Sequence, residues 1–392
     1  MLVTAERLWD GRRLLNRPLV WIEDGRIVSL SGADSAEVNA SAADKVLDFP
    51  SAILAPAFFD VHIHGAAGHD VMESTPEALR CVGTFLASKG TGTYLATTIT
   101  ASLDQTQRAV AGLARLIKNP SLISGEEQPV ARPLGIHLEG PFLSHEKCGV
   151  QPVEHMLAPD IPTFDRIFEA AEGTVRLMTI APELPGAVEL MSHATERGVR
   201  ISLGHSNGTA AETRSAITAG AVSATHTFNA MRALDHREPG ILGTVLTTDS
   251  LYAELICDGI HVAPEMVQLW YRSKRSQRGI LVTDAISASG MPDGEYQLGD
   301  FTVQVAEGRA TARGKLAGSV LTLDRALANF MQYTAAPLED ALPMLTANPA
   351  WMTGLQNSTG FLAEGQPANI IALDETGRLL GSIVNGNLAK HC

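Results

Sequence analysis

Phe58-Phe59-Asp60-Val61-His62-Ile63-His64 is an apolar run that ends in two histidines. Seven more apolar runs follow it, separated by helix-like segments, at residues 92–98, 134–138, 175–180, 199–203, 222–227, 252–257 and 279–283. Runs that are continuous rather than alternating are typical of strands buried on both faces of a parallel sheet. Eight such units predict an α/β fold with a TIM-like (β/α)8 barrel. An open doubly wound sheet is the alternative, but no GxGxxG turn follows any run.

The two ends of the chain have a different pattern. Residues 19–22 and 27–30 are strand-like and flank the turn Glu23-Asp24-Gly25-Arg26, in which Asp-Gly is typical of a hairpin. Residues 368–373 and 381–387 also look like strands separated by turn residues. We therefore expect a small β-sandwich domain built from residues 1–56 and 357–392, and a barrel domain formed by residues 57–356.

The composition is that of a compact enzyme. The chain has 392 residues, of which 45% are hydrophobic, and a formal net charge of -13 without any dense block of Lys or Arg. No apolar stretch approaches the roughly 20 residues that span a bilayer, and charges stand where a signal peptide needs its apolar run. The four cysteines lie far apart and are expected to be reduced thiols. These features predict a soluble, cytoplasmic protein that binds neither nucleic acid nor membranes.

Polar residues stand where nearly every run ends. The carboxyl-terminal ends of barrel strands converge on one mouth, so side chains far apart in the sequence are expected to meet there. One histidine in such a place is usually structural, whereas several histidines and carboxylates together favour a metal site. The residues are His62 and His64, Glu139, Glu183, His205, His226, Asp258 with His261, and Asp284.

Glu139, His205 and His226 follow three separate runs and are the predicted ligands of a catalytic metal ion. One carboxylate and two imidazoles leave a position open for water, as in catalytic rather than structural sites. His62 and His64 are two positions apart, so both imidazoles point to one side of a strand. They are expected either to bind a second ion, bridged to the first through Glu139, or to orient water at the mouth. One or two divalent ions per chain are thus expected, and the ligands suit zinc, iron and other metals.

Asp284 ends the last run and is the candidate acid and base. A carboxylate in this place can take a proton from the attacking water and pass it to a leaving amine. Amide hydrolysis needs that proton, because an amide anion is a very poor leaving group. The residues at the strand ends therefore predict metal-dependent hydrolysis of an amide.

Seven motifs resemble those of the N-acetylglucosamine-6-phosphate deacetylases, a family of the amidohydrolase superfamily, and keep their order across nearly the whole chain. HLEGPF together with HTFNAM is highly specific to this family. Ile383-Val384-Asn385-Gly386 near the end also matches. The seven motifs are His62-Ile63-His64-Gly65, His137-Leu138-Glu139-Gly140-Pro141-Phe142, Gly204-His205-Ser206, Thr225-His226-Thr227-Phe228-Asn229-Ala230-Met231, Arg237-Glu238-Pro239-Gly240, Asp258-Gly259-Ile260-His261 and Val282-Thr283-Asp284-Ala285.

The resemblance implies a barrel with a small β-sandwich domain, usually in a homodimer, with the metal ligands and the acid and base residue named above. Sugar contacts are implied for Asn229 and Ala230, and phosphate contacts for Arg237 and His261, one of them expected from the partner subunit. Ala317 and Ser319 are also expected among the substrate-binding residues.

One position departs from the family pattern. After the HLEGPF motif the family usually has a histidine that polarises the acetyl carbonyl, and this chain has Gln151, within Gly149-Val150-Gln151-Pro152. A glutamine amide donates a hydrogen bond to a developing oxyanion but carries no positive charge. We therefore expect Gln151 beside the acetyl group, with either more of the polarisation left to the metal or a substrate that differs from the family norm.

The implied reaction is hydrolysis of N-acetyl-D-glucosamine 6-phosphate to D-glucosamine 6-phosphate and acetate, in amino-sugar catabolism or cell-wall recycling. Deacetylation of N-acetylgalactosamine 6-phosphate is the nearest alternative. Cyclic-amide hydrolases of the same superfamily are a second alternative. They resemble one another in a lysine at the end of the fourth strand that joins two metal ions. This chain has Thr179-Ile180-Ala181-Pro182-Glu183 there, without a lysine, which argues against them. A catalytically dead sugar-phosphate sensor is a further alternative, but it would be expected to lack Asp284 or a metal ligand.

Overall fold

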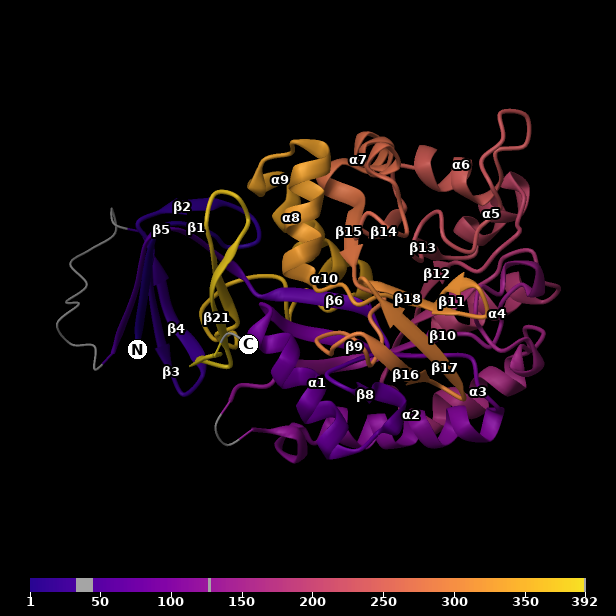
Figure 1. The fold of residues 1–392 in the computed structure, drawn as a ribbon, viewed down its shortest axis with the longest axis horizontal. Helices are drawn as coiled ribbons and strands as arrows, with labels where there is room; N and C mark the ends of the chain where they lie inside the picture. The colour runs from indigo at the N-terminus through magenta and orange to yellow at the C-terminus, as the bar shows by residue number, and fades with distance from the viewer. Residues whose placement is uncertain (33–44, 126–127, 391–392) are drawn as a thin grey trace.

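The computed structural model describes residues 1–32, 45–125 and 128–390 (Figure 1). Within these residues, one sheet of eight parallel strands runs in the order β15-β14-β13-β12-β11-β10-β9-β6. The predicted runs are all strands of this sheet, which confirms the barrel. Their bounds are β6 Phe58–Ile63, β9 Thr91–Thr98, β10 Arg132–Glu139, β11 Val175–Ile180, β12 Arg200–Leu203, β13 Ala221–Ala224, β14 Tyr252–Ile256 and β15 Gly279–Val282.

The barrel closes between the first strand and the segment that follows the last one. Asp284 N donates to His62 O at 2.9 Å, and His64 N donates to Ala285 O at 2.8 Å. The seam is thus held by backbone hydrogen bonds on both sides of Ile63, which is buried. As a result, the histidine pair of the first strand lies directly beside Asp284.

Helices connect the barrel strands and cover the outside of the barrel (Figure 1). Most bury an apolar stripe, as amphipathic helices do; in α1 it includes Leu79, Val82 and Leu86. Ser102 and Thr209 form capping boxes that begin α2 and α5. The bounds are α1 Pro76–Ser88, α2 Leu103–Lys118, α3 Ile161–Ala170, α4 Ala187–Glu196, α5 Ala210–Thr218, α6 Gly240–Thr247, α7 Pro264–Arg278, α8 Leu323–Thr334, α9 Leu338–Leu345 and α10 Ala347–Thr353.

Both ends of the chain contribute to a second sheet, at the left of Figure 1. Strand β5 joins the two ends, because it pairs in parallel with β1 and antiparallel with β20. The predicted hairpin is β3 with β4, and its turn residues Asp24 and Gly25 have φ values of 47° and 75°. The strands are β1 Leu2–Trp9, β2 Leu14–Asn16, β3 Leu19–Glu23, β4 Arg26–Ser31, β5 Val46–Pro56, β20 Ile370–Leu373, β21 Leu379–Val384 and β22 Asn387–Leu388.

This sheet has its own apolar cluster, which includes Val3, Leu8, Val20, Leu54 and Ile370. It confirms a strand-rich unit built from both termini. The division of the chain at residues 56/57 and 356/357 stays a prediction.

A four-stranded antiparallel sheet follows the last barrel strand and was not expected. Its strands are β16 Gly294–Leu298, β17 Phe301–Ala306, β18 Arg309–Ala312 and β19 Lys315–Leu316. Phe301, Val303 and Val305 pack in one cluster with Ile99, which follows barrel strand β9, and with Ile286, which follows β15. The sheet therefore lies at the carboxyl-terminal side of the barrel. A smaller pair, β7 Gly65–Ala66 and β8 His69–Asp70, lies after the first strand.

Among the described residues, no helix is long and apolar enough to cross a membrane.

Candidate metal and active site

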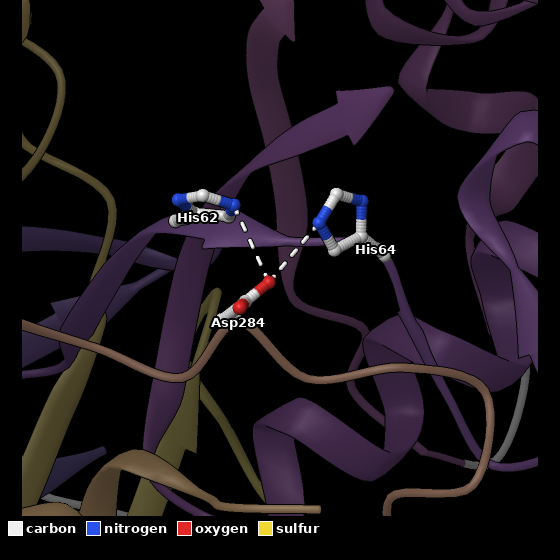
Figure 2. A group of neighbouring side chains, drawn as sticks. All are labelled: His62, His64 and Asp284. Atoms are coloured by element: carbon white, nitrogen blue, oxygen red, sulfur yellow. Dashed lines mark ion pairs between the residues drawn. The ribbon is translucent and has the colours of Figure 1, made fainter. Parts of the chain in front are cut away.

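Two groups of metal-ligating side chains meet at the barrel mouth. One consists of His62, His64 and Asp284 (Figure 2), and the other of Glu139, His205 and His226. In each group the ligand atoms lie within 4.8 Å of one another. The structure thus brings together the predicted metal ligands and the predicted acid and base residue, although they span more than half of the chain.

Glu139 belongs to the second group and also contacts the first. Its Oε1 is 3.2 Å from His205 Nε2, 3.1 Å from His226 Nε2 and 3.4 Å from His62 Nε2. Its Oε2 is 3.4 Å from His64 Nε2. A carboxylate in this position can contribute an oxygen to either group, or one to each.

Asp284 faces the pair of histidines from the other side. Its Oδ1 is 3.1 Å from His64 Nε2 and 3.4 Å from His62 Nε2. Figure 2 shows the carboxylate pointing between the two imidazoles. Asp284 is therefore a possible ligand that faces the Nε2 atoms of both histidines.

Three of these residues, each two positions after the end of a barrel strand, have an unusual backbone conformation. His205, His226 and Asp284 have φ values of 46°, 29° and 50°, in the left-handed region that side chains other than glycine rarely adopt. Such conformations cost about 1–3 kcal/mol each and persist where the surrounding structure enforces them, often at active sites. Here the left-handed backbone occurs at three residues whose side chains meet at the mouth.

The charges at the mouth require compensation by a cation or by protons. Burial alone would lower the pKa of His62 and of His64, but the carboxylates of Glu139 and Asp284 outweigh burial. They raise the pKa of His62 well above its usual value and that of His64 to about 9. Burial would raise the pKa of Glu139, but His62, His205 and His226 hold it well below its usual value.

The donor set fits a divalent metal ion. It combines carboxylate oxygens with imidazole nitrogens, which are ligands for zinc, iron and similar ions. His62 Nε2 faces two carboxylates and has no hydrogen-bond partner among the described residues. A cation near this nitrogen would satisfy it and both carboxylates at once.

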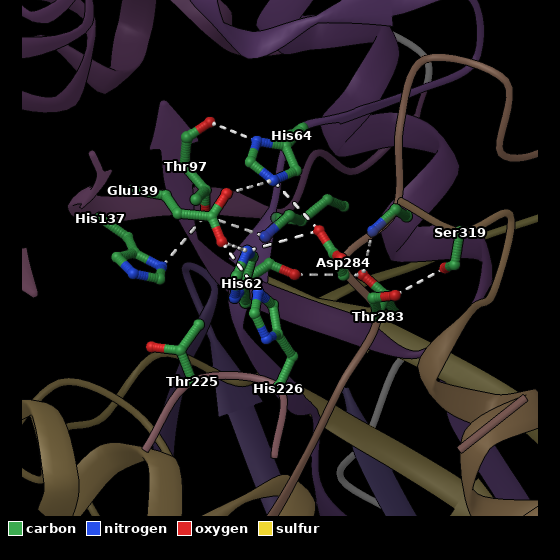
Figure 3. A network of polar contacts seen from close by, with 12 residues as sticks. His62, His64, Thr97, His137, Glu139, Thr225, His226, Thr283, Asp284 and Ser319 are labelled. Carbon is green, nitrogen blue, oxygen red and sulfur yellow. Dashed lines mark hydrogen bonds and ion pairs between the residues drawn. The ribbon is translucent and has the colours of Figure 1, made fainter. Parts of the chain in front are cut away.

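Figure 3 shows the polar network that joins these residues to their neighbours. His137 is buried beneath the site, where Nδ1 lies 3.1 Å from Val61 O and Nε2 lies 2.8 Å from Thr179 Oγ1. Thr179 Oγ1 is in turn 2.7 Å from Thr225 Oγ1, next to His226. Burial holds the pKa of His137 well below its usual value, so this histidine is a neutral, structural one.

A cavity of about 190 Å³ opens onto the metal-ligating groups. Four predicted substrate-binding residues line it, namely Gln151, Asn229, Ala230 and His261. The unexpected four-stranded sheet contributes Leu298 and Leu316 to its wall. His261 Nδ1 lies 2.7 Å from Asp258 Oδ2, which leaves the other ring nitrogen free to contact a ligand.

Gln151 is buried and contacts Glu139 directly. Its Nε2 donates to Glu139 Oε2 at 2.6 Å, and its Oε1 accepts from Thr100 N at 2.8 Å. The amide is thus fixed at both ends, and one of its donors is used on a metal-ligating carboxylate. The sequence placed Gln151 beside the acetyl group, and the structure adds this link to Glu139.

Three predicted residues lie outside the wall of the cavity. Arg237 is exposed on the loop before α6, and the neighbouring Glu238 accepts hydrogen bonds from Ala210 N and Gly240 N. Ser319 Oγ donates to Thr283 O at 2.6 Å, and Ala317 packs in the apolar cluster of the four-stranded sheet. Gly318 between them does line the cavity, so a substrate contact here would use the backbone.

The sequence did not indicate Glu254 as a site residue. This carboxylate lies inside β14, fully buried, and its Oε2 is 3.3 Å from His62 Nδ1. A charged residue inside an otherwise apolar run was the available signal. Among the other strand-end residues, Glu183 accepts hydrogen bonds from Ser206 Oγ and Asn207 N, and so holds the loop that carries His205.

Comparison with known proteins identifies the family of the chain. Residues 53–389 match the Amidohydrolase family. The chain is 38% identical to the N-acetylglucosamine-6-phosphate deacetylase of Lysinibacillus sphaericus, over 91% of this chain and 89% of the other. It is 35% identical to the N-acetylgalactosamine-6-phosphate deacetylase of Escherichia coli O157:H7, over 97% and 98% of the two chains.

The fold is also similar to a solved structure. A mutant N-acetyl-D-glucosamine-6-phosphate deacetylase from Mycobacterium smegmatis, in complex with N-acetyl-D-glucosamine-6-phosphate, matches with a TM-score of 0.89 and 33% identity over 99% of both chains. These matches confirm the resemblance found in the sequence motifs. The chain belongs to the amidohydrolase family and, within it, to the N-acetylglucosamine-6-phosphate deacetylases.

Proposed function

We propose that this chain hydrolyses the acetamide of N-acetyl-D-glucosamine 6-phosphate, giving D-glucosamine 6-phosphate and acetate. The observation that carries the proposal is the position of Glu139, which belongs to one group of metal-ligating residues, contacts the other and lines the same cavity as Asp284. The family assignment supplies the amino-sugar substrate, through the relatives named above.

Glu139, His205 and His226 would hold one divalent ion, and His62, His64 and Asp284 a second one that shares Glu139. A bound divalent ion supplies polarisation of the acetyl carbonyl and makes a water molecule more acidic. Zinc and iron suit these ligands. Metal analysis under saturating metal tests the arrangement: two equivalents per chain support it, and one equivalent leaves His62 and His64 with the task of orienting water.

Asp284 moves the proton in this scheme. Without a bound ion, burial favours its neutral form but His62 and His64 lower the pKa of Asp284 to about 2, so that the carboxylate is ionised at neutral pH. The water oxygen attacks the acetyl carbon while Asp284 takes a proton from it. The carbon–nitrogen bond then breaks, and Asp284 returns the proton to the amine nitrogen. Gln151 Nε2 uses one hydrogen on Glu139 Oε2 and would donate the other to the carbonyl oxygen.

The remaining predicted residues would bind the sugar and its phosphate. Asn229, Ala230 and His261 line the cavity of their own chain, whereas Arg237 is exposed on its loop. We propose that the enzyme is a cytoplasmic homodimer. In this dimer Arg237 would reach the phosphate in the cavity of the partner subunit. A guanidinium presents a fork of donors that matches phosphate oxygens.

N-Acetylgalactosamine 6-phosphate is the second candidate substrate, because a deacetylase named for it is 35% identical to this chain over nearly its whole length. Acetate release from N-acetylglucosamine and N-acetylgalactosamine, each with and without the 6-phosphate, tests both candidates. We expect the highest kcat/KM for N-acetylglucosamine 6-phosphate. A higher value for the galacto epimer would overturn the choice of sugar, and no acetate from any of the four would overturn the function.

A further inference from the structure

Glu254 is a fully buried carboxylate that has no part in the reaction described above. It lies in the middle of strand β14, Tyr252–Ile256, with its side chain inside the barrel. A buried carboxylate costs several kcal/mol unless nearby groups compensate it. An apolar residue would suit this strand better, so the carboxylate calls for a specific explanation.

Few groups compensate this charge. Its Oε2 lies 3.3 Å from His62 Nδ1 and accepts a longer hydrogen bond, of 3.4 Å, from His226 N. Its Oε1 has no hydrogen-bond partner in the described part of the chain. The imidazole of His62 is thus the only side chain among the described residues with which the Glu254 carboxylate makes a hydrogen bond or an ion pair.

His62, His64 and His205 share one arrangement at the mouth. In each ring Nδ1 contacts an oxygen of a supporting residue, and Nε2 points toward the metal-ligating groups. His64 Nδ1 lies 3.2 Å from Thr97 O, and His205 Nδ1 lies 2.9 Å from Lys147 O. His62 differs because its Nδ1 meets a carboxylate instead of a neutral carbonyl. A carboxylate on Nδ1–H fixes the tautomer and makes the opposite nitrogen a stronger electron donor to a metal.

We propose that Glu254 is a positioning residue that holds His62 with Nδ1–H on its carboxylate and Nε2 toward Glu139 and Asp284, and thereby sets the affinity of the His62/His64/Asp284 group for a divalent cation. The proposal rests on the proposed function, since it deepens the second metal position. It explains why a carboxylate is kept inside an apolar strand, with one oxygen unpartnered.

Glu254→Gln and Glu254→Leu separate this role from simple packing. Glutamine keeps the size and an acceptor for Nδ1–H but removes the charge, whereas leucine removes both. Loss of such an outer partner typically weakens metal binding about 10–100-fold. We expect weaker cobalt(II) binding at the His62 group, with leucine more affected than glutamine, and a smaller effect on the ion at Glu139, His205 and His226, where Glu254 contacts only the backbone of His226. Unfolding of the metal-free Leu variant should not be easier, since it no longer buries the charge.

The experiment titrates the metal-free full chain with cobalt(II) and records metal equivalents and the visible absorption spectrum. Asp165→Asn is the matched control, because it removes a carboxylate that lies 2.7 Å from His193 Nε2 on helices α3 and α4, away from the mouth. This control should bind metal like the wild type. Wild-type binding and spectrum in Glu254→Leu would overturn the proposal, as would a larger effect of glutamine than of leucine.

A second measurement separates failure of this proposal from failure of the two-ion arrangement. If the wild type itself binds only one equivalent, the second ion is ruled out, and Glu254 is then judged from crystal structures of the metal-free wild type and Glu254→Leu. A rotated or disordered His62 ring in the variant supports the positioning role. An unmoved ring overturns it.

Discussion

Asp60 and Thr283 join the first and the last strand of the barrel directly beneath the mouth. Thr283 Oγ1 donates to Asp60 Oδ2 at 2.6 Å, although 223 positions separate the two residues. Asp60 also accepts from His62 N at 3.2 Å, and both side chains are buried. This contact fixes the strand ends that carry His62 and Asp284. It is therefore a structural hydrogen bond on which the geometry of the site depends.

Thr283→Val should destabilise the protein in a pH-dependent way. Burial raises the pKa of Asp60 to about 7, while the Thr283 hydroxyl lowers it, so this hydroxyl stabilises the charged form. Its contribution is fully present only well above pH 7, where Asp60 is ionised with or without the hydroxyl, and it declines as the pH falls through about 7. We expect a loss of about 1.5–3 kcal/mol at pH 8 and about 0.5–1.5 kcal/mol at pH 5. Urea unfolding at both pH values measures it, and equal losses would contradict the role of the charge.

Removal of divalent metal should abolish deacetylation. The carboxylates and imidazoles at the mouth form two groups that could each hold a cation, which would polarise the acetyl carbonyl. Chelation followed by acetate assay should give no turnover, and added zinc, iron or cobalt should restore it. Full activity in a preparation shown to be metal-free would refute the mechanism.

Asp284→Asn should lower kcat by on the order of 10²-fold or more, since it keeps the shape but removes the base. The ion at Glu139, His205 and His226 should remain, because Asp284 contacts His62 and His64 instead. Steady-state kinetics with metal analysis of the same sample tests both points. A variant with wild-type kcat would exclude Asp284 as the proton carrier.

Gln151→Ala should lower kcat more than it raises KM. The change removes the hydrogen bond of 2.6 Å to Glu139 Oε2 and the donor that we propose for the developing oxyanion, which would act mainly in the transition state. Gln151→His, which restores the residue usual in the family, is the informative companion and should retain more activity than alanine. An unchanged kcat in Gln151→Ala would mean that the amide has no role in the reaction.

Arg237→Lys should raise KM for the phosphorylated sugar roughly 10-fold or more, because hydrogen bonds between charged groups contribute about 1.5–3 kcal/mol. Hydrolysis of the unphosphorylated sugar should hardly change, and equal losses on both substrates would contradict a phosphate contact. If Arg237 and His261 meet across a dimer, mixing an Arg237 variant with a His261 variant regenerates some intact sites. Exchange of subunits without any recovery would exclude the shared site.

The sequence by itself determined the strands and the chemistry of their ends. Continuous apolar runs identify strands buried on both faces, and eight of them close into a barrel whose ends converge. For this reason Glu139, His205, His226 and Asp284 could be placed together before any coordinates. The sheet of strands β16–β19 was not predicted, although the alternation of apolar residues at Phe301, Val303 and Val305 is typical of a strand.

Only the tertiary structure decided which side chains touch. The periodicity of the sequence indicates which face of a strand is buried. It does not indicate which residue of another strand lies at the same height. The contact of Gln151 with Glu139, and that of Glu254 with His62, depend on the height of each residue along its own segment and on the closure of the barrel. Arg237 lies outside the cavity of its own chain for a similar reason, since a loop's direction follows from packing and not from its motif.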